Sequence, residues 1–231
     1  MWPIEDSSLG RILVAPDVPP GFAVLSTTRD YPGKIVAHEL TGLLRERFGL
    51  ETSLTTCRQV HGASVAQGRG DDAWRECDSC DALWSVERHT SLGIKVADCL
   101  PVALIDPAHQ AIANVHSGWR GALQRVTAAT LEAAPLDPAT THAWLGPSIR
   151  ACCFEVGEEV ATQFEERFLD RSRAKAHVDL VAYTVDLLLS RGIAEERIHD
   201  SGACTRCDDS IFHSYRREGP GGGRNLVLVA Q

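Results

Sequence analysis

The chain has 231 residues, of which 44% are hydrophobic and 23% charged, a composition typical of a soluble globular protein. Its formal net charge of −8 argues against non-specific binding to nucleic acid. No apolar run approaches the roughly 20 residues that cross a bilayer, and the acidic opening MWPIEDSSLG lacks a signal peptide's apolar core, so we expect a cytoplasmic protein with no membrane partner.

The first half of the chain combines short apolar runs with two longer helical patterns. Residues 21–29 (GFAVLSTTR) predict a strand, and 34–50 predict a helix with one apolar face and Gly49 as a stop signal. A second helix is predicted over 118–134, ending before Pro135. Further strands are predicted at 53–66, 81–85, 91–97, 101–106 and 110–116.

The second half repeats this mixture of elements. Strands are predicted at 142–146 and 224–230, and helices at 155–168 and 178–192, where apolar residues recur every three or four positions. Strands outnumber helices and do not alternate strictly with them. We therefore expect an α/β chain of the α+β type, with mixed β-sheets covered by helices rather than a doubly wound parallel sheet, in a single domain over 1–231.

Three residues have side chains that suit a metal site. His61, Cys99 and His116 each end or interrupt an apolar run, and Gly or Pro follows each one closely. Zinc binds neutral imidazole and thiolate, and a catalytic zinc keeps three protein ligands and one open position. Taken singly, a histidine at a strand end is more often structural, and a buried cysteine is often a small hydrophobe. A hydrolase with Cys99 as nucleophile and His116 as base uses the same residues, so spacing alone leaves the choice open.

The other cysteines form rival groups. Cys77/Cys80 and Cys204/Cys207 are both Cys-x-x-Cys pairs, but they lie much further apart than the roughly 15 to 20 residues typical of a zinc ribbon. Neither pair lies between a strand and an obvious helix start, as a thioredoxin-like dithiol does. The adjacent cysteines at 152–153 are expected to pack rather than to bridge each other. The roles of both Cys-x-x-Cys pairs stay open.

The motifs RQVHG, ADCLPV, NVHSGWRGA, LGPSIRACCFEVGEEV, AHVDL and SYRREG occur in this order, from about Thr27 to the C-terminus. In this order they resemble the laccase-domain family, whose members are described as multicopper polyphenol oxidoreductases, purine nucleoside phosphorylases and peptidoglycan editing factors. The resemblance implies a sandwich of mixed β-sheets flanked by helices. It also implies that His61, Cys99 and His116 bind zinc.

One segment departs from the family pattern. After TTR the family usually carries a glycine-rich GGVS stretch, a segment around SLNLG and an acidic GDD turn. Here TTRDYPGKIVAHEL runs almost directly into the predicted helix, although Arg29 still matches the arginine of TTR. We therefore expect a shortened or rebuilt pocket rim, which leaves the range of substrates open.

The resemblance implies phosphorolysis of adenosine, inosine and S-methyl-5'-thioadenosine, together with deamination of adenosine. Zinc lowers the pKa of bound water to about 7, which suits deamination. Asp98, beside Cys99, is a candidate proton carrier, or it only holds a turn. A guanidinium can bind phosphate through two parallel hydrogen bonds, so Arg29 and Arg120 are candidate phosphate-binding residues and Arg216 is a third. Each arginine can instead pair with a carboxylate.

Three other functions compete with a purine nucleoside enzyme. Copper is the alternative metal, in a polyphenol oxidase, but a blue-copper site adds a weak axial ligand, often Met, and the only methionine is Met1. A hydrolase that edits a peptidoglycan precursor is implied by the resemblance alone. A non-catalytic metal-binding interaction module is the third alternative, which a closed fourth ligand on the metal would favour.

Overall fold

The computed structural model describes residues 1–31, 33–70 and 72–231, and within them the strands form two large mixed sheets and one small sheet. The seven-stranded sheet has the order β1 (Ile4–Ser7), β2 (Gly10–Val14), β3 (Ala23–Thr27), β15 (Asn225–Ala230), β8 (Thr90–Val96), β4 (Ser53–Cys57) and β6 (Trp74–Cys77). The six-stranded sheet has the order β14 (Ile198–Asp200), β11 (His142–Leu145), β9 (Leu100–Asp106), β10 (Ala111–Ser117), β7 (Ala82–Ser85) and β5 (Val65–Gln67). The small sheet pairs β12 (Leu169–Asp170) with β13 (His177–Val178).

The helices are short, and most of the regular structure is formed by strands. They are α1 (Ala37–Phe48), α2 (Trp119–Leu123), α3 (Val126–Ala133), α4 (Glu158–Ala161), α5 (Leu180–Ser190) and α6 (Tyr215–Glu218), with 3₁₀ turns at Glu166–Phe168, Glu195–Arg197 and Gly219–Gly221. None of the helices in the described ranges is long and apolar enough to cross a membrane.

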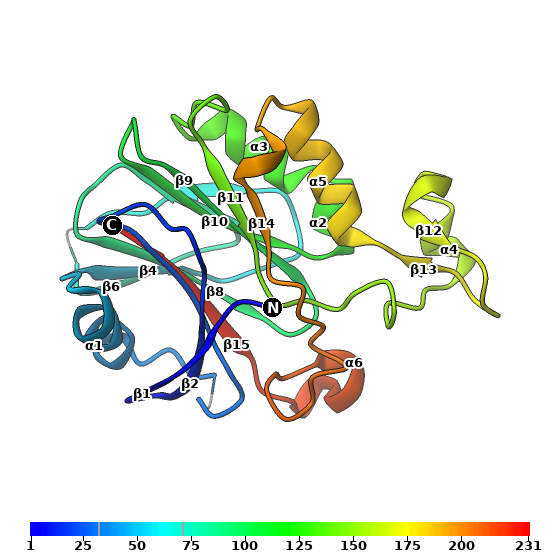
Figure 1. The fold of residues 1–231 in the computed structure, drawn as a ribbon, viewed down its shortest axis with the longest axis horizontal. Coiled ribbons are helices and arrows are strands. Elements are labelled where there is room, and N and C mark those ends of the chain that lie inside the picture. Colours follow the sequence, from blue (N-terminus) through cyan, green and yellow to red (C-terminus); the bar gives the residue numbers. More distant parts are fainter. Residues whose placement is uncertain (32, 71) are drawn as a thin grey trace.

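The two large sheets lie face to face, with α1 on the outer side of one and α2, α3 and α5 on the outer side of the other (Figure 1). Side-chain alternation along the strands produces these layers. In β15, Val227 faces the other sheet and Leu228 faces α1, whereas in β9 Ile105 faces the other sheet and Leu104 faces the helices. This arrangement confirms the predicted mixed sheets flanked by helices; the single-domain organisation stays a prediction.

The predicted helix over 118–134 forms, but in two pieces. Arg125 between α2 and α3 adopts the left-handed conformation, with φ 62° and ψ 39°, which ends α2 and begins α3. The helix predicted over 34–50 is confirmed as α1, and Gly49 ends it in the left-handed conformation with φ 70°.

The helix predicted over 155–168 is wrong. Only the single turn α4 and one 3₁₀ turn form there, because the backbone is extended at Glu165, with ψ 144°. The apolar spacing that suggested a helix still reflects burial. Phe164 and Phe168 both pack edge-on against Tyr183 of α5, with ring centroids 5.5 and 5.3 Å apart.

A short crossover between the two sheets positions the candidate site. β8 belongs to one sheet and β9 to the other, and only residues 97–99 connect them. Asp98 has φ 82°, an uncommon value for a residue other than glycine, which allows this tight crossing. Because β9 pairs antiparallel with β10, His116 lies opposite Pro101. The crossover therefore ends beside His116.

Candidate metal centre and cavity

The structure brings together the three side chains predicted as metal ligands. His61 comes from the loop after β4, Cys99 from the β8–β9 crossover and His116 from β10. One potential ligand atom of each lies within 4.8 Å of the others. The two imidazole rings meet edge to face, with centroids 4.9 Å apart. Two imidazoles and a thiolate are donors that zinc binds, so the chemistry of this set fits the ion.

A buried aspartate that the sequence analysis did not identify holds both histidines in place. Asp81 is fully buried, and its Oδ1 accepts hydrogen bonds from His116 Nδ1 at 2.8 Å and from the His61 backbone N–H at 2.9 Å. Its Oδ2 accepts from the backbone N–H groups of Gly62 at 2.7 Å and Val60 at 3.2 Å. Engaging His116 at Nδ1 leaves Nε2 free for a metal, which is the usual role of a carboxylate behind a histidine ligand. The sequence signal is an acid placed directly before the apolar strand β7, three residues after Asp78.

Cys99 and His116 shift each other's pKa in opposite directions. Burial alone raises the pKa of Cys99, but its hydrogen bonds with His116 and His61 lower the pKa to about 6. Burial alone lowers the pKa of His116, but its hydrogen bonds with Asp81 and Cys99 raise the pKa to about 9. The thiolate is the form that binds metal ions. Metal binding would therefore release a proton from the His116 ring.

Gly118 permits the close approach of two ligands. A Cβ atom at this position would lie 2.8 Å from Cys99 Sγ and 3.4 Å from His61 Cδ2. Contacts below 3.0 Å force a neighbouring atom to move, and here that atom is a proposed ligand. The glycine after the His-Ser pair is therefore needed for the geometry of the centre, although its own φ of −72° is ordinary.

The three ligands lie in the wall of a cavity of about 680 Å³. Among the residues that the structure describes, the lining is strongly cationic, with five basic side chains against one carboxylate, that of Asp98. Such a surface attracts anions, and low-dielectric walls strengthen the attraction. The basic residues are Arg58, Lys95, Arg120, Arg216 and Arg224.

Three aromatic rings also line this cavity, and each has the guanidinium group of a lining arginine over its face. The distances from the guanidinium carbon to the ring centroid are 4.4 Å for Arg120 over Trp119, 5.7 Å for Arg224 over Tyr215 and 5.8 Å for Arg216 over Phe154. Cation–π contacts of this kind hold both partners in defined orientations. The cavity therefore combines flat π surfaces with positive charge.

Asp98 lines the cavity beside Cys99, but both of its oxygens already accept hydrogen bonds. Oδ1 accepts from Thr205 Oγ1 and Oδ2 from the Arg216 backbone N–H, each at 2.6 Å. These bonds tie the crossover to two distant segments, which favours the predicted holding role. Proton transfer by Asp98 stays a prediction, because hydrogen bonds at catalytic groups often rearrange when substrate binds.

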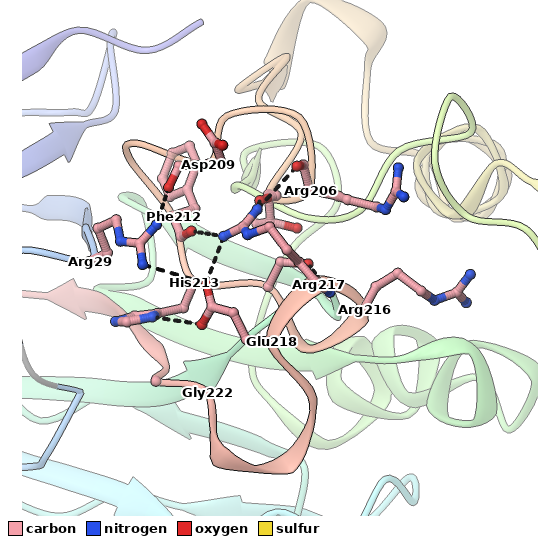
Figure 2. Close-up of polar contacts among 12 residues, drawn as sticks. Arg29, Arg206, Asp209, Phe212, His213, Arg216, Arg217, Glu218 and Gly222 are labelled. Atoms are coloured by element: carbon pink, nitrogen blue, oxygen red, sulfur yellow. Dashed lines mark hydrogen bonds and ion pairs between the residues drawn. The ribbon is translucent and has the colours of Figure 1, made fainter.

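The predicted phosphate-binding arginines divide into two groups. Arg120 and Arg216 line the cavity, and among the described residues Arg120 forms no ion pair. Arg29 is not part of the lining: its guanidinium lies 3.7 Å from the Glu218 carboxylate and donates to the Asp209 backbone oxygen. Figure 2 shows Arg29 within this cluster around Glu218, while the Arg216 side chain extends away from it. Substrate binding by Arg29 stays a prediction.

Comparison with known proteins gives one family across most of the chain. The family model described as multi-copper polyphenol oxidoreductase laccase matches residues 24–231. The adenosine deaminase RL5 of an unknown prokaryotic organism is 33% identical, over 74% of this chain and 72% of RL5. A purine nucleoside phosphorylase of Xylella fastidiosa strain 9a5c is also 33% identical, over 87% of this chain and 89% of that protein.

Solved structures share the fold. Protein NMB0706 of Neisseria meningitidis has a TM-score of 0.80 at 25% identity, covering 95% of this chain and 98% of its own. The hypothetical protein YfiH of Bacillus licheniformis has a TM-score of 0.84 at 20% identity, covering 99% of this chain and 98% of its own. By the extent of the family match and the identity to its relatives, the chain belongs to the multi-copper polyphenol oxidoreductase laccase family.

Proposed function

We propose that this chain is a zinc-dependent purine nucleoside enzyme. It would cleave adenosine, inosine and S-methyl-5'-thioadenosine with phosphate, and it would also deaminate adenosine. Relatives named as purine nucleoside phosphorylases and an adenosine deaminase, 27% to 35% identical, support a purine nucleoside substrate. The observation that carries the proposal is that the His61, Cys99 and His116 group opens onto a cationic cavity with three aromatic walls.

The aromatic walls account for recognition of a purine base. Trp119, Phe154 and Tyr215 come from different parts of the chain and present their rings to one space of about 680 Å³. This volume lies within the range of cavities that enclose small ligands. Stacking of a base on an aromatic ring contributes about 1 to 3 kcal/mol and needs no hydrogen-bond pattern. The walls therefore suit more than one purine nucleoside.

The basic side chains account for recognition of phosphate. Arg120 and Lys95 line the cavity without an ion pair among the residues described, so both can meet an incoming anion. Arg216 donates through Nη1 to the Glu155 backbone oxygen, which holds its guanidinium at the cavity wall. We assign Arg120 as the main phosphate-binding group, because a free guanidinium can donate two parallel hydrogen bonds.

His61, Cys99 and His116 would hold the zinc, with Asp81 fixing the ring of His116. Zinc held there would supply the chemistry of a metal-activated water, whose pKa falls to about 7, and so a nucleophile at neutral pH. Copper fits the same donors, but a blue-copper centre usually adds a weak axial Met. Met1 is 61% exposed and does not line the cavity, which favours zinc.

The direct test is chromatography of adenosine incubated with the zinc-loaded protein, with and without phosphate. We expect adenine only when phosphate is present, inosine without phosphate, and inosine together with hypoxanthine formed from it when phosphate is present. Cys99→Ala removes one of three ligands and should abolish both products. Chelation separates the zinc enzyme from a hydrolase with Cys99 as nucleophile, because activity without metal would favour the latter.

Arginine variants test the phosphate site. Arg120→Ala should lose most phosphorolysis and keep deamination, since only phosphorolysis needs phosphate. Arg29 pairs with Glu218 outside the cavity lining, and Arg29→Ala tests whether it too binds phosphate. Arg45→Ala is the matched control, because its side chain is 63% exposed and pairs with Glu51. Absence of any product from adenosine would refute the assignment and make the peptidoglycan precursor the next substrate to test.

A further inference from the structure

A second group of metal-binding side chains lies outside the centre described above. Cys152, Cys153, Cys204 and Cys207 are all free thiols, and their sulfur atoms lie within 4.8 Å of one another. Cys152 and Cys153 do not bridge each other, and only Cys153 is buried, whereas Cys152 is exposed. Cys152 and Cys153 lie beside the Cys-x-x-Cys pair formed by Cys204 and Cys207.

The sulfur spacing matches a single tetrahedral ion. With zinc–sulfur bonds of about 2.3 Å, tetrahedral geometry sets the sulfurs about 3.8 Å apart. Cys152 Sγ lies 3.7 Å from Cys153 Sγ, 3.7 Å from Cys204 Sγ and 3.8 Å from Cys207 Sγ. Cys153 Sγ lies 3.3 Å from Cys207 Sγ. Sulfurs that share one metal ion lie this close together, whereas those around a polynuclear cluster lie farther apart.

The fold, rather than the cysteines themselves, brings the two segments together. β11 and β14 are parallel neighbours, so the loops that follow their carboxyl ends leave the sheet at the same end (Figure 1). The two loops join again at a bridge between Ser148 and Cys204. The Arg150 backbone oxygen accepts from Cys153 N at 2.8 Å, and Asp208 Oδ2 accepts from Cys204 N at 3.1 Å. Both cysteine pairs therefore lie in turns held by their own hydrogen bonds.

The surroundings suit a negatively charged tetrathiolate. Four thiolates around a divalent cation carry a net charge of −2, and Arg206 Nη1 lies 3.6 Å from Cys153 Sγ. Cys152 and Cys207 are exposed, which gives an ion a path into the site. Cys204 and Cys153 are buried, which limits later exchange with solvent.

We propose that Cys152, Cys153, Cys204 and Cys207 bind a second zinc ion in a closed, structural site. Four protein ligands leave no open position, so this ion would stabilise the fold rather than take part in catalysis. The proposal does not depend on the activity of the cavity. It also gives the Cys204/Cys207 pair a partner other than Cys77/Cys80.

The second site would brace one wall of the cavity. Thr205 lies between two of its ligands and donates to Asp98 Oδ1, and its backbone oxygen accepts from Arg217 Nη1 at 2.9 Å. Phe154, which lines the cavity, directly follows Cys153. A zinc ion that links the two loops would therefore keep Asp98 and Phe154 in position.

The test is metal analysis of protein expressed with zinc and purified under reducing conditions. The Cys99→Ala/His61→Ala variant removes the cavity centre and should keep one zinc per chain. X-ray absorption of that sample should show a shell of sulfur alone at about 2.3 Å. The reciprocal variant Cys152→Ser/Cys207→Ser, which alters the two exposed ligands, should lose this zinc and unfold at a lower temperature. Cys77→Ser, a buried cysteine outside both groups, is the matched control and should keep the full zinc content.

Cobalt provides a spectroscopic readout of the same site. Cobalt(II) added to the metal-free Cys99→Ala/His61→Ala protein should produce the intense visible absorption of tetrahedral thiolate coordination, and adding Cys152→Ser/Cys207→Ser to that variant should abolish it. A Cys99→Ala/His61→Ala protein that binds no zinc while all four thiols react freely with a thiol reagent would overturn the proposal. Disulfides among these cysteines in the reduced preparation, or iron in place of zinc, would overturn it equally.

Discussion

Replacement of Asp81 by asparagine tests how the cavity centre is built. The side chain is fully buried and accepts four hydrogen bonds, two at each carboxylate oxygen. Asparagine has nearly the same shape but replaces one oxygen with an NH₂ group that accepts nothing. Two of the four donors must therefore lose their partner. If the NH₂ group faces His116, the ring must accept at Nδ1, which places the proton on Nε2, where a metal would bind.

The expected cost follows from these contacts. Each buried donor left without a partner costs about 1 to 3 kcal/mol, so with two such donors the free energy of unfolding should fall by about 2 to 6 kcal/mol. Loss of the carboxylate behind a histidine ligand typically weakens metal binding by about 10- to 100-fold. Both effects are expected in Asp81→Asn: a lower melting temperature of the metal-free protein and a weaker zinc affinity in a chelator competition assay.

Asp106→Asn is the matched control for this experiment. Asp106 is also fully buried and accepts from five donors, including Asp137 N at 2.8 Å and Thr140 Oγ1 at 2.8 Å, but it lies outside the cavity lining. It should lose similar stability and keep its zinc affinity at the cavity centre. The reasoning fails if Asp81→Asn folds and binds zinc as tightly as the unchanged protein, or if both variants lose affinity equally.

Three further predictions concern single sites. Gly118→Ala should weaken zinc binding at the cavity centre by about 10-fold or more, as titration would show, because its Cβ would meet Cys99 Sγ at 2.8 Å. Gly42→Ala, inside α1 with no atom near the new Cβ, should instead raise the free energy of unfolding by about 0.5 to 1 kcal/mol; a loss in urea denaturation would contradict this. Burial alone raises the pKa of Asp106, but its hydrogen bonds from Asp137, Thr140 and His109 lower it. The stability due to this carboxylate is therefore present above its unfolded pKa of about 3.9 and lost as the pH falls below that value. Denaturation at a series of pH values should show the free energy of unfolding of Asp106→Asn approaching that of the unchanged protein in acid. A difference in free energy that stays constant with pH would refute the assignment.

Local patterns determined much of the fold. The helix α1 and the strand β15 follow directly from apolar periodicity and from Gly49, because such patterns depend on residues close together in the sequence. The same local signals failed over 155–168, where apolar residues at helical spacing are buried by two turns packed on Tyr183. Periodicity reports which residues are buried and does not distinguish a helix from successive turns that bury the same side chains.

The sequence alone also predicted three residues of the centre, His61, Cys99 and His116, which each end or interrupt an apolar run. Only the tertiary structure decided how they combine. Asp81 reaches His116 because β7 and β10 are neighbours in one sheet, whereas it reaches the His61 backbone through the loop that follows β4. Likewise, Cys204 and Cys207 meet the adjacent pair at 152–153 rather than Cys77 and Cys80, because β11 and β14 lie in parallel. Contacts between distant segments depend on strand pairing, which is a property of the whole folded chain.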